Sequence, residues 1–257
     1  MQAECIRARV EGAVGFIQLH RPHAANALNR QMVREIAEQA EAFDQEDGIR
    51  VIVFEGSTQA FAAGADIEEM KEASPVRFEL DDPFADWDRL QRLHKPVIAK
   101  VSGFALGGGF ELALHADVII AADNAQFGFP EVTLGVLPGA GGTQLLPRLI
   151  GQARALSLIW SGERISARQA GDLGICAKTV PPELLDEETK RFADTLSRQA
   201  PVALRLIKEA VCRGTDLPLQ EGMRLERKNF YLSMGTSDQK EGMRAFIEKR
   251  RPSFQGE

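Results

Sequence analysis

Two glutamates lie in glycine-rich stretches of the sequence, where carboxyl groups could take part in proton transfer. Glu111 follows three consecutive glycines in ALGGGFELAL (105–114), and Glu131 follows Pro130 in FGFPEVTLGVLPGAGG (127–142). A glycine-rich turn that enters a helix exposes main-chain N–H groups, and these can stabilise an anion that develops during a reaction. A carboxyl group beside such a turn is a candidate general acid or base.

Both glutamates also have a structural interpretation, and the residues alone leave it open. Glu111 could complement the helix dipole, although the apolar residues that follow it predict burial, and burying an unpaired carboxylate is unfavourable. Glu131 could be a solvated loop acid. His115 lies four residues after Glu111 and could share its helix face, and we expect it to form a structural hydrogen bond.

A third stretch, AFAAGADIEEM (60–70), combines small residues with a helix signal. The small side chains of residues 62–65 leave room for a ligand, and Asp66 can cap a helix that runs to Met70. Such a loop is a good place for a main-chain N–H donor, but it is also a common structural turn.

The elements that must position these stretches alternate between strand and helix patterns in the first half of the chain. Short apolar runs predict strands at 14–19, 51–54, 96–101 and 118–121. Helical spacing of apolar residues predicts helices at 29–43 and 84–93. From about residue 186 only helix patterns follow, at 186–199, 201–213, 219–234 and 238–250. We therefore predict an α/β core over residues 1–195 and a helical region over residues 196–257.

Composition and charge narrow the functional class. The 257 residues carry a net charge of -6, which argues against a general nucleic-acid binder. No apolar run is long enough to cross a bilayer and no signal-peptide pattern opens the chain, which predicts a cytoplasmic protein without a membrane partner. The 3 cysteines are far apart and the 4 histidines lack metal-ligand spacing, so we expect reduced thiols and no metal site.

Taken together, the three glycine-rich stretches resemble the crotonase (enoyl-CoA hydratase/isomerase) superfamily. The shared pattern includes FAAGAD, KPVIA, ALGGG with ELAL, and PGAGGTQ in that order, and it extends from LHRPHAANALN (19–29) to EGMRAFIEKRRPSF (241–254). The resemblance implies a crotonase-like spiral of ββα units and a C-terminal helical region that assembles homotrimers or homohexamers. The sequence is most similar to the hydratases of this family, which use two glutamates to add water to a 2-enoyl-CoA.

The resemblance also implies a role for individual residues. It makes Glu111 and Glu131 the acid/base pair and assigns an oxyanion hole to the main-chain N–H groups of Ala65 and Gly108. Gly139 would leave room beside the catalytic water. The residues implied to hold coenzyme A are Ala63, Gly64, Ala65, Asp66, Ile67 and Gly108, together with Lys249, and Phe246 beside it, from a neighbouring subunit. Coenzyme A enters as part of an acyl-CoA substrate, so no separate cofactor is implied.

Three positions depart from the family pattern. Lys100 stands where a small residue is common, Leu145 stands where arginine is frequent, and Glu68 stands where some relatives have lysine. These departures concern coenzyme A affinity and acyl preference, and they leave the acid/base pair intact.

Two other functions remain alternatives. An enoyl-CoA isomerase moves a double bond on the same scaffold and often uses one acid/base group, so the presence of both glutamates favours a hydratase. A non-catalytic RNA-binding relative should have lost a glutamate or gained a basic face, and this sequence shows neither. The acyl group is not fixed by the sequence, although residues 82–90 and the segment after Gly139 are expected to shape its pocket.

Overall fold

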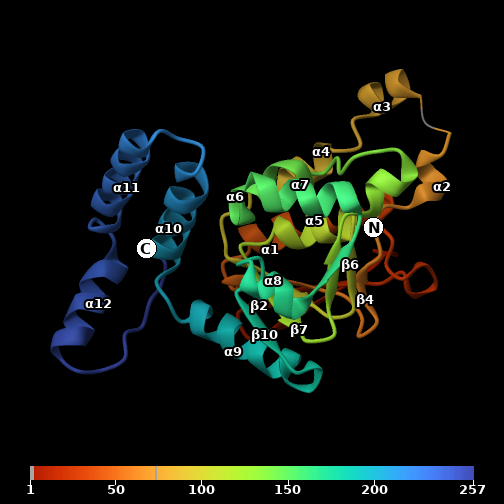
Figure 1. Ribbon diagram of the computed structural model, residues 1–257. Coiled ribbons are helices and arrows are strands. Elements are labelled where there is room, and N and C mark those ends of the chain that lie inside the picture. The colour runs from red at the N-terminus through yellow and green to blue at the C-terminus, as the bar shows by residue number, and fades with distance from the viewer. Residues whose placement is uncertain (1–2, 73) are drawn as a thin grey trace.

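Two β-sheets of different size form the centre of the structure, a computed structural model that describes residues 3–72 and 74–257 (Figure 1). The strands are β1 (Ile6–Glu11), β2 (Val14–Leu19), β3 (Val51–Glu55), β4 (Ala60–Ala62), β5 (Val97–Val101), β6 (Phe104–Leu106), β7 (Val118–Ala122), β8 (Gln126–Gly128), β9 (Arg164–Ser166) and β10 (Lys178–Val180). The larger sheet has the order β1-β2-β3-β5-β7-β10, and the smaller sheet has the order β4-β6-β8-β9. Neighbouring strands are parallel except for the β1–β2 and β8–β9 pairs.

Helices connect the strands and make up the C-terminal part of the chain. They are α1 (Arg30–Gln45), α2 (Ile67–Met70), α3 (Pro75–Asp81), α4 (Ala85–Leu90), α5 (Gly108–Leu114), α6 (Gly142–Ile150), α7 (Gln152–Ser161), α8 (Ala167–Asp172), α9 (Leu185–Ser197), α10 (Pro201–Gly214), α11 (Leu219–Ser233) and α12 (Ser237–Ile247). Short 3-10 helices are η1 (Pro22–Ala24), η2 (Pro130–Leu134) and η3 (Pro182–Leu184). Among the residues described, no helix combines the length and the apolar character needed to cross a membrane.

The chain alternates between the two sheets as it advances. Strands β3, β5 and β7 of the larger sheet are followed directly by β4, β6 and β8 of the smaller sheet, and helical segments come next. This is a spiral of ββα units, so the predicted α/β fold class with C-terminal helices is confirmed. Helices α10, α11 and α12 extend to one side of the sheets and form a C-terminal arm (Figure 1).

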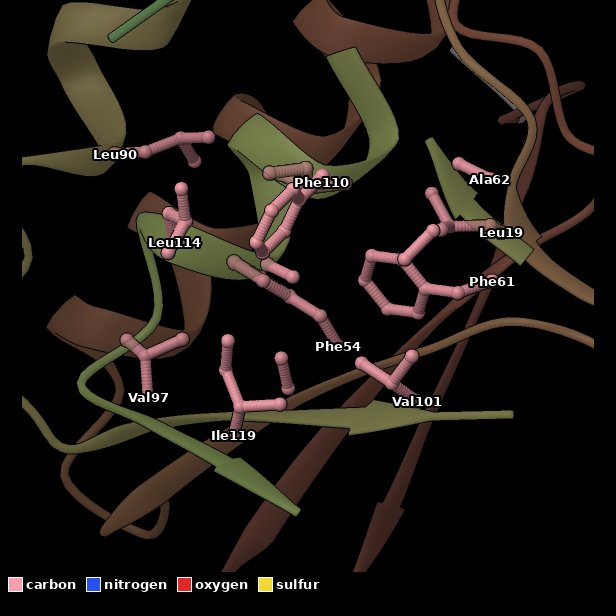
Figure 2. Close-up of a cluster of buried hydrophobic side chains, with 14 of the residues drawn as sticks. Leu19, Phe54, Phe61, Ala62, Leu90, Val97, Val101, Phe110, Leu114 and Ile119 are labelled. Carbon is pink, nitrogen blue, oxygen red and sulfur yellow. The ribbon is translucent and has the colours of Figure 1, made fainter. Parts of the chain in front are cut away.

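Both faces of the larger sheet are buried, which explains why its central strands are mostly apolar. In β3, Ile52 and Phe54 belong to the main core, whereas Val51 and Val53 pack in a second cluster with residues of α9. Figure 2 shows Phe110 of α5 close above Phe54 of the sheet. Burying a phenylalanine side chain contributes about 1.5–3 kcal/mol, so this packing fixes α5 on the sheet.

The strands and helices predicted from apolar patterns are found close to their expected positions. The strands β4, β6, β8, β9 and β10 are not predicted, because three residues are too few to show an alternating pattern. Strand β1 and the helices α3, α6, α7 and α8 are not predicted either. The last helix was expected to run to residue 250, but it ends at Ile247. Lys249 has a left-handed φ of 56°, and the Arg250 N–H donates to the Ala245 carbonyl at 3.0 Å, which closes the helix early.

Lys100 lies in an ion-pair network on the face of the larger sheet that α9 covers. Its Nζ is 2.6 Å from Glu55 Oε2 and 2.9 Å from Asp186 Oδ1. Glu55 is buried and also pairs with Arg9 of β1. A buried carboxylate needs such partners, because an unpaired charge out of water is strongly unfavourable. This departure from the family pattern therefore has a structural role.

Candidate active site

The N-terminus of α5 lies against the loop that follows β4. A Cβ atom added to Gly108 would lie 3.6 Å from the main-chain nitrogen of Ala65, so the two residues predicted to form an oxyanion hole are neighbours. Within residues 3–72 and 74–257, neither of their N–H groups donates a hydrogen bond to another protein group. The arrangement can therefore offer two donors to one ligand oxygen.

The glycines on either side of Gly108 make this close approach possible. Gly107 has φ 49° and ψ -125°, a conformation that residues with side chains rarely adopt. A Cβ atom on Gly107 would also lie 2.6 Å from Glu131 Oε1, and one on Gly109 would lie 2.2 Å from the carbonyl oxygen of Ala62. The helix can therefore begin directly on β4, and the Glu131 carboxyl group can reach its first turn.

Main-chain hydrogen bonds hold the loop that contains Ala65. The Leu28 N–H donates to the Gly64 carbonyl at 2.7 Å, and the Asp66 N–H donates to the Leu28 carbonyl at 2.9 Å. The Asp66 side chain accepts from the Glu68 N–H at 3.2 Å, which confirms the predicted cap of α2. The loop is thus fixed on both sides of the Ala65 peptide.

Two polar residues behind this loop have no role assigned by the sequence analysis. Arg21 Nη2 lies 2.9 Å from Asp66 Oδ2. Asn26 is buried, has φ 57°, and donates to the carbonyl oxygens of Ala60 and Phe61 at 3.2 and 3.1 Å. Both residues lie in the stretch that resembles the family, but their partners are distant in sequence, so no local pattern reveals these contacts.

Glu111 is buried on α5, where two main-chain N–H groups orient it. Its Oε1 accepts hydrogen bonds from the N–H groups of Ala140 and Gly142, both at 2.8 Å, and only 3% of the residue is exposed. Burial raises the pKa of the Glu111 carboxyl group, and the two hydrogen bonds oppose this rise because they favour the carboxylate. Since both hydrogen bonds are made to Oε1, Oε2 can accept a hydrogen bond from a ligand.

Glu131 is the second residue of η2, and its carboxyl group points back to the N-terminus of α5. Its Oε2 is buried and, among the residues described, has no hydrogen-bond partner. Burial first, and the charge on Glu111 to a smaller extent, raise the pKa of Glu131 to about 7, against a hydrogen bond from its own main-chain N–H. Glu131 is therefore not a solvated loop acid, and it interacts electrostatically with Glu111.

Gly139 lies in the loop that Glu111 holds and faces an aromatic side chain. A Cβ atom on Gly139 would lie 2.8 Å from Phe84 Cζ, at the start of α4. Trp87 of α4 is buried, and its ring centroid lies 5.6 Å from that of His115. The structure thus brings the segment expected to shape the acyl pocket to the Gly139 loop.

Lys249 and Phe246 are not brought to this site within one chain. Phe246 lies in α12 of the C-terminal arm, and Lys249 follows this helix. The arm lies on the opposite side of Figure 1 from α2. Phe246 is 85% exposed, and Ile67 at the start of α2 is 48% exposed. A contact between the end of α12 and the loop at 63–67 would therefore need a second subunit.

Known proteins resemble the chain over almost its whole length. The family model for enoyl-CoA hydratase/isomerase matches residues 9–257. A probable enoyl-CoA hydratase of Mycobacterium tuberculosis is 46% identical over 254 residues, which cover 99% of each chain. The 2,3-dehydroadipyl-CoA hydratase of Escherichia coli is 42% identical over 241 residues, which cover 94% of each chain.

Solved structures agree with this similarity in fold. A crystal structure of subunit I of an enoyl-CoA hydratase from Geobacillus kaustophilus has a TM-score of 0.97 and 59% identity, with 99% of each chain covered. An enoyl-CoA hydratase from Bacillus anthracis has a TM-score of 0.93 and 37% identity, with 99% of this chain and 100% of that chain covered. The structural similarity thus includes the arm as well as the spiral.

The environment of Glu131 predicts a carboxyl group that loses its proton near neutral pH. Its pKa of about 7 lies above the usual value, so Glu131 should be protonated below pH 7 and ionised above it. Infrared difference spectra between pH 6 and pH 8 should therefore show loss of a carboxylic acid C=O band. This band should shrink in Glu131→Gln. Identical difference spectra for the two proteins would contradict the assignment.

Proposed function

Because the chain belongs to the enoyl-CoA hydratase/isomerase family, we propose that it adds water across the 2,3 double bond of a trans-2-enoyl-CoA to give a 3-hydroxyacyl-CoA. The observation that carries the proposal is the convergence of four groups at the start of α5. The N–H groups of Ala65 and Gly108 are neighbours, Glu131 Oε1 lies against Gly107, and Glu111 lies in the first turn.

In the proposed reaction, the two main-chain donors bind the thioester oxygen. Attack of water on C3 moves electron density to this oxygen and produces an enolate. Donors fixed in advance around the oxygen favour the enolate over the neutral carbonyl, which lowers the barrier. The hydrogen bonds between residues 28 and 64–66 support this role because they hold the Ala65 peptide rigidly.

The environments of the two carboxyl groups support different roles. Glu111 accepts two N–H bonds that favour its ionised form, so it orients the water and takes a proton from it as the C3–O bond forms. Glu131, with a pKa of about 7, is protonated in a large fraction of molecules at neutral pH and gives its proton to C2. The product then carries both elements of water, and proton transfer from Glu111 to Glu131 restores the starting state.

We further propose that coenzyme A is held by the loop at 63–67 and by Lys249 of a neighbouring subunit in a trimer or a pair of trimers. The C-terminal arm supports assembly because it exposes large apolar side chains, which seldom form extended patches on monomers. These side chains include Ile207, Val211, Phe230, Tyr231, Phe246 and Ile247. Covering them would bring the end of one arm toward the site of another subunit.

The function is tested by following the conjugated double bond of the substrate in the ultraviolet. We expect crotonyl-CoA to lose conjugation as water is added, and Glu131→Gln to bind it but to reduce turnover at least about 100-fold, because general acid–base catalysis contributes that much. Glu183→Gln, at an exposed position, is the matched control and should be unchanged. An isomerase would instead gain conjugation from a 3-enoyl-CoA and leave crotonyl-CoA intact.

The oxyanion hole is tested at Gly108, the first residue of α5. Gly108→Pro removes the donor N–H at a helical position that tolerates proline, and it should lower turnover about 10²–10³-fold. Gly108→Ala keeps the N–H, and its Cβ would meet its nearest neighbour at an ordinary 3.6 Å, so it should lose much less. Equal turnover of the two folded variants would remove this N–H from the mechanism.

The assembly is tested by sedimentation velocity at micromolar concentration. The chain has a mass of 28.2 kDa, and we expect a species three or six times heavier. Phe246→Asp together with Ile247→Asp should dissociate it, because charges would replace apolar side chains in the interface. A single-chain species in the unmodified protein would contradict the proposal.

A further inference from the structure

His115 contacts the same loop residue that holds Glu111, but through its carbonyl group instead of its N–H group. His115 Nε2 lies 2.7 Å from the carbonyl oxygen of Ala140. The same residue, Ala140, donates its N–H to Glu111 Oε1 at 2.8 Å. Glu111 and His115 are four residues apart, at the two ends of one helical turn. The two side chains therefore bind the N–H and the carbonyl group of Ala140 respectively.

The direction of the second hydrogen bond fixes the state of the imidazole. A carbonyl oxygen can only accept, so Nε2 must carry the hydrogen. Burial lowers the pKa of His115 against opposing effects of this hydrogen bond and of Asp88, which favours a neutral ring at neutral pH. A neutral Nε2–H anchors the carbonyl without placing a positive charge beside the Glu111 carboxylate, where it would weaken the base.

The Ala140–Gly141 peptide depends on this anchor, whereas the next peptide is also held by α6, because the N–H groups of Gln144 and Leu145 donate to the Gly141 carbonyl at 2.9 and 2.8 Å. Gly139 and Gly141 flank Ala140, and Gly141 has a left-handed φ of 113°. Glycine turns of this kind have many accessible conformations, so the peptide orientation is set by hydrogen bonds from outside the loop. The Ala140 residue is only 9% exposed, so its carbonyl would be left without a partner if the imidazole were removed.

We propose that His115 is a positioning residue for Glu111: its Nε2–H fixes the Ala140 carbonyl and thereby the main-chain N–H group of Ala140, which holds the carboxylate together with that of Gly142. This inference rests on the proposed role of Glu111 as the base. Without His115, the Ala140–Gly141 peptide can turn and the N–H bond from Ala140 to Glu111 loosens. The Glu111 carboxyl group is then less well oriented, and its ionised form is less favoured.

The test compares two substitutions that differ in the donor. His115→Met removes it, whereas the side-chain amide of His115→Gln can present an N–H at a similar reach. We expect His115→Met to lower kcat on crotonyl-CoA about 10-fold, within the range for leaving a buried polar group unpaired, with KM changed less than twofold. His115→Gln should recover most of kcat. The control is His94→Met, which removes an exposed contact with Asp44 at 3.0 Å and should leave kcat unchanged.

The pH profile separates positioning from a general loss of structure. The limb of kcat/KM that reports ionisation of Glu111 should move to higher pH in His115→Met, because weaker N–H bonds favour the protonated acid, and it should stay in place in His115→Gln. Equal losses in the two variants, a normal kcat in His115→Met, or a change confined to KM would overturn the proposal.

A readout that does not need turnover keeps this inference separate from the proposed function. In protein labelled with ¹⁵N-histidine, the nitrogen shifts of His115, identified by their loss in His115→Gln, should report a neutral ring with hydrogen on Nε2 at pH 7. Hydrogen on Nδ1 would overturn the inference even in an active hydratase. If the unmodified protein does not hydrate crotonyl-CoA while Nε2 carries the hydrogen, the proposed function fails and the anchoring of the loop stands.

Discussion

The contact between the N-terminus of α5 and the main chain after β4 is the constraint on which the site depends. The proposed donors are main-chain N–H groups, so backbone packing sets their positions, and side chains matter only through the space that they occupy. Gly109 leaves room for the Ala62 carbonyl, where a Cβ would lie at 2.2 Å. Below it, Phe110 packs on the larger sheet, so the same helix that carries the site is anchored in the core (Figure 2).

The second constraint is the different hydrogen bonding of Glu111 and Glu131. Burial raises the pKa of both Glu111 and Glu131, because each loses water around its charged form. Glu111 recovers part of this loss through two N–H bonds from the Gly139–Gly142 loop, whereas Glu131 has an oxygen without a partner among the residues described. The two carboxyl groups thus differ in their hydrogen bonding, and this difference supports separate proposed roles as base and acid. In the proposed positioning role, His115 acts on the Glu111 carboxylate indirectly, through its hydrogen bond to Ala140.

Two features away from the site, the Lys100 ion-pair network and the C-terminal arm, concern stability and assembly. The ion-pair network of Lys100, Glu55 and Asp186 lies on the face of the larger sheet that α9 covers, while α5 packs on the other face. The Lys100 network therefore stabilises the opposite face of the sheet from the one on which α5 packs. The C-terminal arm exposes large apolar residues such as Phe246, and this exposure is why we propose that other subunits cover it and complete the coenzyme A site.

The sequence by itself determined the main strands, the long helices and the burial of Glu111, because each depends on apolar residues at regular local spacing. Through the family resemblance it also indicated Ala65, Gly108 and both glutamates, whose roles stay predictions until activity is measured. Only the tertiary structure decided what holds them. Glu111 accepts a hydrogen bond from the N–H of Ala140, which lies 29 positions later in the sequence, and Arg21 pairs with Asp66, which lies 45 positions later. No local pattern encodes such contacts, since they exist only once separate turns of the spiral have packed side by side.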